Sequence, residues 1–254
     1  MQLGDWADMP SLSSYDVGKR QHEGRRYRLD IGAANIGMDT LMEPIEKWNA
    51  TKKKNKEKPY RPSLYYTRGN HEYRIQKAVD SDARMEGAIG YDDLNIESYG
   101  WDIIDFLEPV CIDGVTYCHY FCNTQSSRPY SGYSIDTRIK NVGFSFVQGH
   151  QQLYLTGVRA LNNGRRVRGI VCGACYIHDE DYRGPQGNAE WRGVLMLHEV
   201  NNGDYSVMEV SLDYLCRRYE GVRLWQFVRR KYPEIFEKSL WMKRQSMQEI
   251  LCQR

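Results

Sequence analysis

The sequence predicts a mixed α/β protein, and two patterns support this class. In residues 30–50, apolar side chains recur at helical spacing, and residues 64–67 then form a short β-branched and aromatic run that ends at Gly69. The second half instead holds short strand-like segments joined by hairpin signals. These signals are Asp113-Gly114, Asn162-Asn163-Gly164 and Asn201-Asn202-Gly203. Helices are therefore expected to pack against sheets, with antiparallel hairpins later in the chain.

The composition is that of a soluble globular protein. The 254 residues are 41% hydrophobic and 27% charged, and the net charge of +2 does not by itself imply a nucleic-acid partner. Apolar runs such as residues 193–197 are far too short to span a membrane, and no basic-then-apolar leader opens the chain. We therefore expect a cytoplasmic protein without a membrane partner. Its odd number of cysteines, seven, favours buried reduced thiols over a disulfide framework.

The chain opens with a segment that is typical of a strand end followed by a turn. Asp5 follows Gly4, and Asp8 comes one turn later. Only three residues precede Gly4, whereas a central strand usually has about five or six. The sequence is therefore expected to start partway into an element. Two carboxylates at this spacing are also common in ordinary turns.

Residues 9–27 are polar and basic and predict an exposed loop, whose serines and arginines could meet a phosphate. An amphipathic helix is expected over residues 30–50, with Asp30 as its N-cap and Pro44 as a point of kinking or division. Residues 52–58 are rich in lysine and predict a solvated connection.

The strand at residues 64–67 carries the most informative turn. Gly69 lets the backbone turn sharply, so Asn70 and His71 are presented at the carboxyl end of the strand, where open α/β sheets keep their chemistry. An amide oxygen suits a hard divalent cation, and a neighbouring imidazole can protonate a leaving oxygen. An ordinary polar turn is the alternative interpretation. A helix over residues 73–85 and short helical pieces over 91–107 are expected to follow.

Two later strands also end in histidine. Residues 109–112 and 115–119 form a predicted hairpin that His119 closes, and the strand at residues 144–147 runs into Gly149 and His150. A histidine at a strand end is often structural, so each one needs partners before it counts as a ligand. Further strands are expected over residues 153–160, 166–172, 193–200 and 205–212.

Two other features carry weaker predictions. Cys172 and Cys175 have the spacing of a thiol redox pair or half a zinc site, but they match buried strand cysteines better. Residues 213–254 predict a helical extension. From residue 214 onward it holds ten Lys or Arg and four Glu, which gives ten minus four, or +6. This basic face could bind nucleic acid or could simply be solvated.

Asp5, Asn70, His119 and His150 thus lie at four predicted strand ends, and together they make a coordination shell for Mn, Fe, Zn or a similar divalent ion. On these residues the chain resembles the calcineurin-like metallophosphoesterase superfamily, most closely the phosphoesterases of tailed bacteriophages. The matching motifs, in order, are Gly4-Asp5-Trp6-Ala7-Asp8, Gly69-Asn70-His71-Glu72, His119 and Gly149-His150. Any one of them is a weak signal, whereas four in sequence are specific.

The resemblance implies a four-layer α/β/β/α sandwich of two mixed sheets over residues 1–212, which carries two divalent metal ions. It implies that Asp5 bridges both ions and that Asn70, His119 and His150 complete the shell of one. His71 matches the general acid, and Asp8 matches the carboxylate that orients it. A metal-activated hydroxide would then hydrolyse a phosphate mono- or diester.

Two departures from the family pattern affect the other metal site. Family members begin with a strand that ends in Asp-x-His, for which this sequence has no room, and Gln152 stands where they usually carry a second histidine. Gln152 could still offer its side-chain oxygen. We therefore expect one metal site to be nearly intact and most of the other to be lost, and the short first strand favours a truncated product or a late start codon.

Three functions remain in competition. The first is a metal-dependent phosphatase or phosphodiesterase, in which Arg68 and Arg74 are the candidate contacts to a phosphorylated substrate. The second is a nuclease of the same superfamily that uses the basic extension. The third is a metal-binding remnant without turnover. Neither the metal, among Mn, Fe, Zn and Mg, nor the substrate can be chosen from the sequence.

Overall fold

The computed structural model describes residues 1–180 and 183–252 and has the expected mixed α/β class. The chain forms two compact units. The first unit comprises Met1–Val110 and Tyr117–Phe121, and the second comprises Cys111–Thr116 and Cys122–Arg254. The chain therefore passes between the units within β3 (Val110–Ile112), within β4 (Val115–Cys118) and again after Phe121, and not at residue 212. The boundary of the expected family domain at residue 212 stays a prediction.

The first unit contains a small parallel sheet. Strand β1 (Tyr65–Thr67) pairs with β2 (Asp102–Ile104), and Gln2 forms a parallel bridge to Tyr66 on β1. The opening residues thus pair with β1 through one isolated bridge at Gln2, but they do not form the strand end that was predicted. Strand β2 was not predicted, because its three residues lie among polar turns that match short helical pieces.

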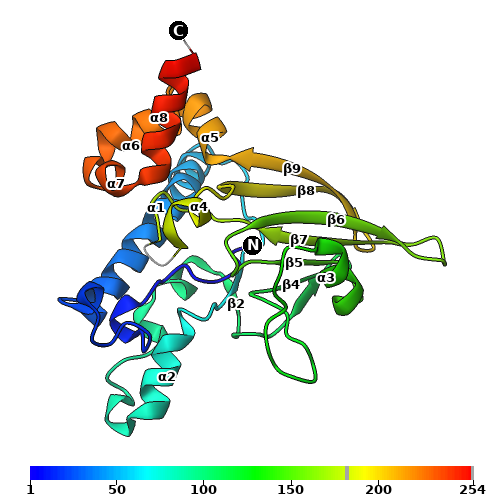
Figure 1. Ribbon diagram of the computed structural model, residues 1–254, viewed down its shortest axis with the longest axis horizontal. Helices are drawn as coiled ribbons and strands as arrows, with labels where there is room; N and C mark the ends of the chain where they lie inside the picture. The colour runs from blue at the N-terminus through cyan, green and yellow to red at the C-terminus, as the bar shows by residue number, and fades with distance from the viewer. Residues whose placement is uncertain (181–182, 253–254) are drawn as a thin grey trace. The chain divides into compact units, whose positions relative to one another are not determined.

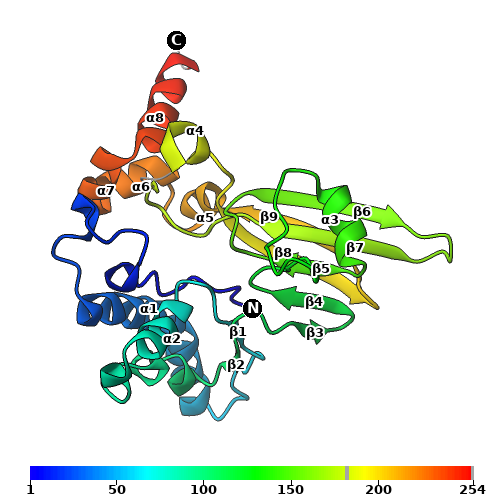
Figure 2. The same ribbon diagram turned by 60° about the horizontal axis from the view of Figure 1, so that its bottom comes forward.

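Two α-helices lie beside this sheet in the first unit (Figure 2). Helix α1 covers Tyr27–Lys54 and α2 covers Tyr73–Ser81. Helix α1 extends beyond the predicted residues 30–50 at both ends, and Pro44 lies inside it without dividing it. Asp30 is not the N-cap but lies in the first turn, where its carboxylate accepts the Ser11 N–H at 2.8 Å. Negative charge there favours the amino end of a helix.

Short 3₁₀ turns connect these elements. They are Pro10–Leu12, Arg20–His22, Ala83–Met85, Tyr91–Asp93 and Glu97–Tyr99. The expected helix over residues 73–85 therefore ends at Ser81 and is followed by one separate turn.

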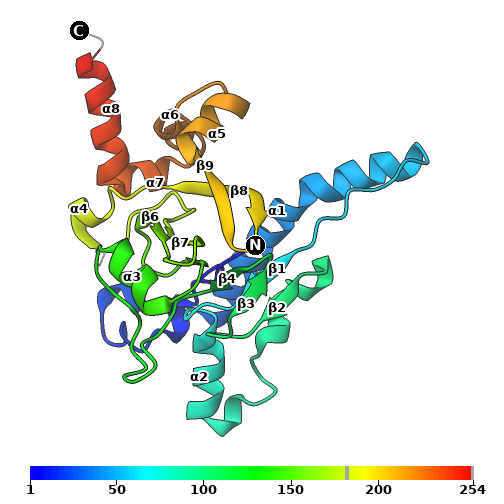
Figure 3. The ribbon, with the colours of Figure 1, turned by 90° about the vertical axis from the view of Figure 1, so that its right-hand side faces the viewer.

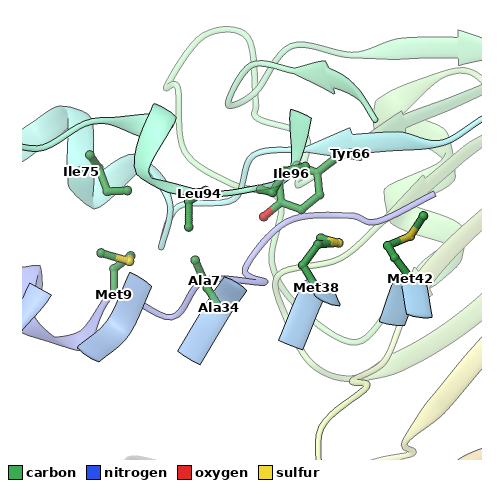
Figure 4. Packing of buried hydrophobic residues seen from close by; sticks show 9 residues of the cluster. All are labelled: Ala7, Met9, Ala34, Met38, Met42, Tyr66, Ile75, Leu94 and Ile96. Carbon is green, nitrogen blue, oxygen red and sulfur yellow. The ribbon is translucent and has the colours of Figure 1, made fainter. Parts of the chain in front are cut away.

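The core of the first unit joins α1 to the N-terminal segment and to β1 (Figure 4). Met38 and Met42 of α1 are buried, and Tyr66 of β1 is fully enclosed. Trp6 adds a hydrogen bond from its indole N–H to the Ala34 carbonyl oxygen at 3.0 Å. The residues just after Gln2 are thereby held between α1 and the carboxyl end of β1.

A mixed sheet with the order β3-β4-β5-β7-β6 continues into the second unit. Its strands are β3 (Val110–Ile112), β4 (Val115–Cys118), β5 (Phe146–Gln148), β6 (Tyr154–Ala160) and β7 (Arg166–Cys172). Strands β5 and β7 are parallel, whereas β6 and β7 are antiparallel. The hairpins predicted at Asp113-Gly114 and Asn162-Asn163-Gly164 are thus present.

Helix α3 (Ile135–Val142) covers one face of this sheet beside β6 and β7 (Figure 1). Its Ile139 lies against Gly169, where an added Cβ would approach the isoleucine Cγ1 to 2.6 Å. Glycine on the strand lets the helix approach closely. Strands β8 (Gly193–Asn201) and β9 (Asp204–Ser211) form the last predicted hairpin, next to β7.

The C-terminal part of the second unit is helical, as expected (Figure 3). Its helices are α5 (Leu212–Tyr219), α6 (Leu224–Lys231), α7 (Pro233–Lys238) and α8 (Leu240–Cys252), whereas the short helix α4 (Gly184–Gly187) comes before β8. Leu224, Val228, Phe236 and Met242 bury a small apolar core among these helices. No helix within the described ranges is both long and apolar enough to cross a membrane.

Candidate metal centre

Asp5 lies in a strained turn next to the end of β1. Gly4 and Asp5 have φ angles of +87° and +57°. Both lie in the left-handed region, which residues other than glycine rarely adopt. A Cβ on Gly4 would lie 2.5 Å from His119 Nδ1, so only glycine fits at this position. Strain of this kind in a non-glycine residue often marks a functional position, because the surrounding structure must hold it.

A second glycine turn meets the first. A Cβ on Gly69 would lie 2.3 Å from the Asp5 backbone nitrogen and 2.2 Å from its Oδ1. The turn that follows β1 therefore touches the Asp5 turn directly. The His71 backbone N–H donates to Asp5 Oδ1 at 3.1 Å, which orients the carboxylate toward Asn70 and His71.

His119 completes the group in the first unit, one residue after β4. Its Nδ1 lies 2.6 Å from the Leu3 carbonyl oxygen, which can only accept a hydrogen bond. This contact assigns the proton of the neutral ring to Nδ1. Nε2 then faces Asn70 Oδ1 at 2.9 Å and Asp5 Oδ2 at 3.4 Å. Three acceptor atoms thus converge, and a cation is what satisfies them together.

The charges of Asp5 and His119 affect each other's pKa. Burial opposes ionisation of Asp5, but its hydrogen bond to His119 and the charges of His119 and His71 lower its pKa to about 2. Burial likewise lowers the pKa of His119, yet the hydrogen bond and charge of Asp5 raise it overall. The Asp5 carboxylate and the His119 imidazole thus each favour the charged form of the other.

The donor set fits a divalent metal. One carboxylate oxygen, one amide oxygen and one imidazole nitrogen suit Mn, Fe or Zn, and the ligand atoms of Asp5 and His119 lie within 4.8 Å of each other. His119 is 1% exposed, and its second nitrogen is held by a backbone carbonyl, as is usual for metal-bound histidines. The group therefore has the donor chemistry of a divalent-metal site, and this chemistry does not select among these metals.

His71 is held beside this site by Asp8. Its Nδ1 lies 2.6 Å from Asp8 Oδ1. Burial lowers the pKa of His71, but the hydrogen bond to Asp8 and the charge of Asp5 raise it overall, which favours the imidazolium form. The Asp8 side chain is 65% exposed, against 21% for His71. The predicted pairing of a histidine with an orienting carboxylate is thus observed as a contact.

The two arginines expected to contact substrate have structural partners. Arg74 Nη1 donates to the Asp8 carbonyl oxygen at 2.8 Å and so braces the turn that carries Asp8. Arg68 pairs with Asp105 and lies over the Tyr91 ring, 3.8 Å from its centroid. A substrate role for Arg68 or Arg74 stays a prediction, and for Arg74 the bracing of Asp8 is the better supported role.

His150 and Gln152 belong to the second unit, just after β5. Both have left-handed backbones, with φ of +66° and +57°. Together with Tyr133 and Arg183 they help line a pocket of about 410 Å³ in that unit. Gln152 Oε1 accepts a hydrogen bond from Arg183 Nη1 at 3.0 Å. The guanidinium thus competes with any cation for this oxygen, which weakens the case for Gln152 as a ligand.

Glu72 had no predicted role, but in the structure it lies against the two turns that carry Asp5 and Asn70. Its side chain is 0% exposed and accepts hydrogen bonds from both glycine turns. The sequence signal that could have indicated this role is an acidic residue directly after Gly69-Asn70-His71. The same residue is the N-cap of α2. Such a residue is usually attributed to the helix alone.

No protein-family model, curated protein or solved structure matches the chain. The case for its function therefore rests on the geometry of the first unit and on the sequence motifs.

Proposed function

We propose that this chain is a metal-dependent phosphoesterase of the calcineurin-like type, which hydrolyses a phosphate mono- or diester. One observation carries the proposal. Asp5 Oδ2, Asn70 Oδ1 and His119 Nε2 converge, and an imidazole oriented by a carboxylate lies directly beside them. A cation site next to a potential proton donor is what the hydrolysis of a phosphate ester requires.

The residues divide the work between binding and proton transfer. Asp5, Asn70 and His119 hold the cation, and His150 joins them as a further ligand, a role that rests on its sequence motif. When bound, the cation neutralises phosphate charge and brings the pKa of water toward neutrality. His71 gives a proton from Nε2 to the departing oxygen, because its Nδ1 is engaged by Asp8.

A single cation is proposed for this chain. In residues 149–152, Gln152 alone was expected to bind the second metal of the family. Its side-chain oxygen instead accepts a hydrogen bond from Arg183. We also propose the four-layer α/β/β/α sandwich of the family for this chain. That fold would bring His150 to the cation.

A nuclease is the second candidate, and one observation favours it. The helical extension exposes cationic side chains at Arg217, Arg218, Arg229, Arg230 and Lys231. Such a surface attracts phosphate backbones, and the attraction weakens steeply with salt. Cleavage of single- or double-stranded DNA that falls steeply between low and moderate salt would select this candidate over a small phosphomonoester.

The test is Mn²⁺-dependent hydrolysis of an aryl phosphate monoester and a diester by the wild type, Asp5→Asn and His119→Ala. The exposed histidine of β8 provides the matched control, His198→Ala. We expect activity in the wild type and the control, and loss in both ligand variants. Mn²⁺ binding without turnover on aryl phosphates or DNA would instead identify a metal-binding remnant.

A further inference from the structure

Glu72 carries a buried carboxylate for which hydrolysis itself has no use. Its Oε2 accepts hydrogen bonds from the Asp5 N–H at 2.9 Å and the Gly69 N–H at 2.7 Å. Its Oε1 accepts from the Ala7 N–H at 2.8 Å and from the Tyr66 hydroxyl at 2.7 Å. Three of the four donors are backbone groups, and these belong to the two turns that carry Asp5 and Asn70.

One carboxylate oxygen thus joins two segments that lie far apart in the sequence. The Asp5 and Gly69 turns are in direct contact, and their two N–H groups point at the same oxygen. Two backbone N–H groups that point at one position form an anion-binding concavity. A negative oxygen therefore holds the turns together where two unpartnered donors would push them apart.

Tyr66 fixes the other side of the carboxylate. Burial raises the pKa of the Tyr66 phenol well above its usual range, and the charge and hydrogen bond of Glu72 raise it further. The hydroxyl therefore remains a donor. Glu72 is held by α2 and Tyr66 on one side and holds the ligand turns on the other.

We propose that Glu72 is a positioning residue that keeps Asp5 and Asn70 in ligand geometry before a cation arrives. This inference rests on the proposed metal site. The strained backbone of Asp5, with φ of +57°, needs such an anchor, because a non-glycine residue keeps this conformation only when the surrounding structure holds it. Outer partners that orient ligands typically contribute about 10- to 100-fold to metal affinity.

Glu72→Gln is the informative substitution. It keeps the volume of the side chain but turns one acceptor oxygen into an NH₂ donor. In either orientation the NH₂ group faces at least one backbone N–H, so one hydrogen bond becomes a repulsive contact. We expect the Mn²⁺ affinity, measured by calorimetry, to fall about 10- to 100-fold while circular dichroism remains that of the wild type.

Tyr66→Phe is the matched control. It removes the phenol donor from the same carboxylate and leaves the three backbone hydrogen bonds in place. This variant should unfold at a lower temperature and lose less Mn²⁺ affinity than Glu72→Gln, because the three backbone hydrogen bonds to the carboxylate remain. A folded Glu72→Gln protein that keeps wild-type affinity, or a Tyr66→Phe protein that loses as much affinity as Glu72→Gln, would overturn the assignment.

A measurement on the metal-free wild type covers the case in which Glu72→Gln does not fold. Residue-resolved hydrogen exchange should show the Asp5, Ala7 and Gly69 amides protected without Mn²⁺, and rapid exchange at all three would refute the proposal. If the wild type binds no Mn²⁺ but these amides are protected, the proposed function is refuted. The role of Glu72 in holding the two turns together would still be supported.

Discussion

At the scale of single residues, the candidate site depends on two glycines that cannot be replaced. Gly4 and Gly69 lie where the Asp5 turn, the β1 turn and His119 meet, and a Cβ on either one would come within 2.6 Å of a neighbouring atom. Ordinary packing does not tolerate such distances. The close approach of three backbone segments is therefore part of the metal site itself.

Gly69→Ala should disrupt this contact. The added methyl group meets the Asp5 nitrogen and Oδ1, so the ligand turn must move. We expect Mn²⁺ affinity to fall at least about tenfold and the free energy of unfolding to fall by about 1–3 kcal/mol, as measured by calorimetry and urea unfolding. Gly32→Ala, in α1 and with open space around it, is the control and should not destabilise the protein.

His71→Gln should reveal proton donation through its dependence on the leaving group. Phenyl phosphate releases a basic oxygen that needs protonation, whereas p-nitrophenyl phosphate does not. General acid catalysis contributes about 10²- to 10⁴-fold, so kcat should fall by this factor on phenyl phosphate and by much less on the nitrophenyl ester. An equal loss on both substrates would contradict the role assigned to His71, and His198→Gln serves as the control.

At the scale of elements, one carboxylate anchors the helical extension. Asp213 of α5 accepts the Leu224 N–H at the start of α6 at 3.0 Å, and it pairs with Arg223 at 2.8 Å and Arg217 at 3.2 Å. Burial opposes ionisation of Asp213, but these hydrogen bonds and charges lower its pKa overall. The carboxylate therefore stabilises the junction of α5 and α6 only while it is ionised.

This lowered pKa predicts a pH dependence of stability. Because the pKa is lower in the folded state than the ordinary value near about 3.9, the stabilisation is present above that value and is lost as the pH falls through the folded pKa. Asp213→Asn should lower the free energy of unfolding at pH 7 by about 1 kcal/mol. Its difference from the wild type should shrink as the pH falls through the lowered pKa of the folded state, as followed by helical circular dichroism during thermal unfolding.

A comparison with Glu43→Gln tests this explanation. Glu43, in the middle of α1, forms an exposed surface pair with Lys47 at 2.7 Å. Exposed pairs contribute little, so this variant should stay close to the wild type at pH 7 and at pH 2. A constant deficit of Asp213→Asn from pH 7 to pH 2 would show that its effect comes from packing and not from charge.

At the scale of the whole molecule, the proposed cation would tie together residues that are far apart along the chain. Asp5, Asn70 and His119 come from three separate segments of the sequence, so an unfolded chain cannot present them together. Binding to the folded state alone stabilises it through mass action. The metal should therefore act as a stabiliser of the fold as well as a cofactor.

Mn²⁺ should raise the unfolding temperature, and a chelator should reverse the change. At a free concentration about 100 times the dissociation constant, the expected gain is about 2.7 kcal/mol. His119→Ala should abolish the shift, because it removes the nitrogen that faces Asp5 and Asn70. A shift that persists in His119→Ala, measured by differential scanning calorimetry, would place the stabilising cation elsewhere.

The elements that depend on local signals were predictable from the sequence. Hairpins at Asp113-Gly114 and at Asn201-Asn202-Gly203 formed as expected, because turn residues and alternating strands act over a few positions. The continuation of α1 through Pro44 and the short strand β2 were not predictable. Buried contacts made by Met38 and Met42 outweigh the breaking tendency of one proline, and β2 exists only because β1 lies beside it.

The sequence by itself determined which residue types are available at the candidate site, because turn chemistry places Asp5, Asn70 and His119 at the ends of short segments. Only the tertiary structure decided that these three meet, that Asp8 holds His71, and that Glu72 joins two ligand turns from below. The physical reason is the distance along the sequence over which each interaction acts. A turn depends on neighbouring residues, whereas hydrogen bonds between residues 66 or 67 positions apart depend on how the whole unit packs.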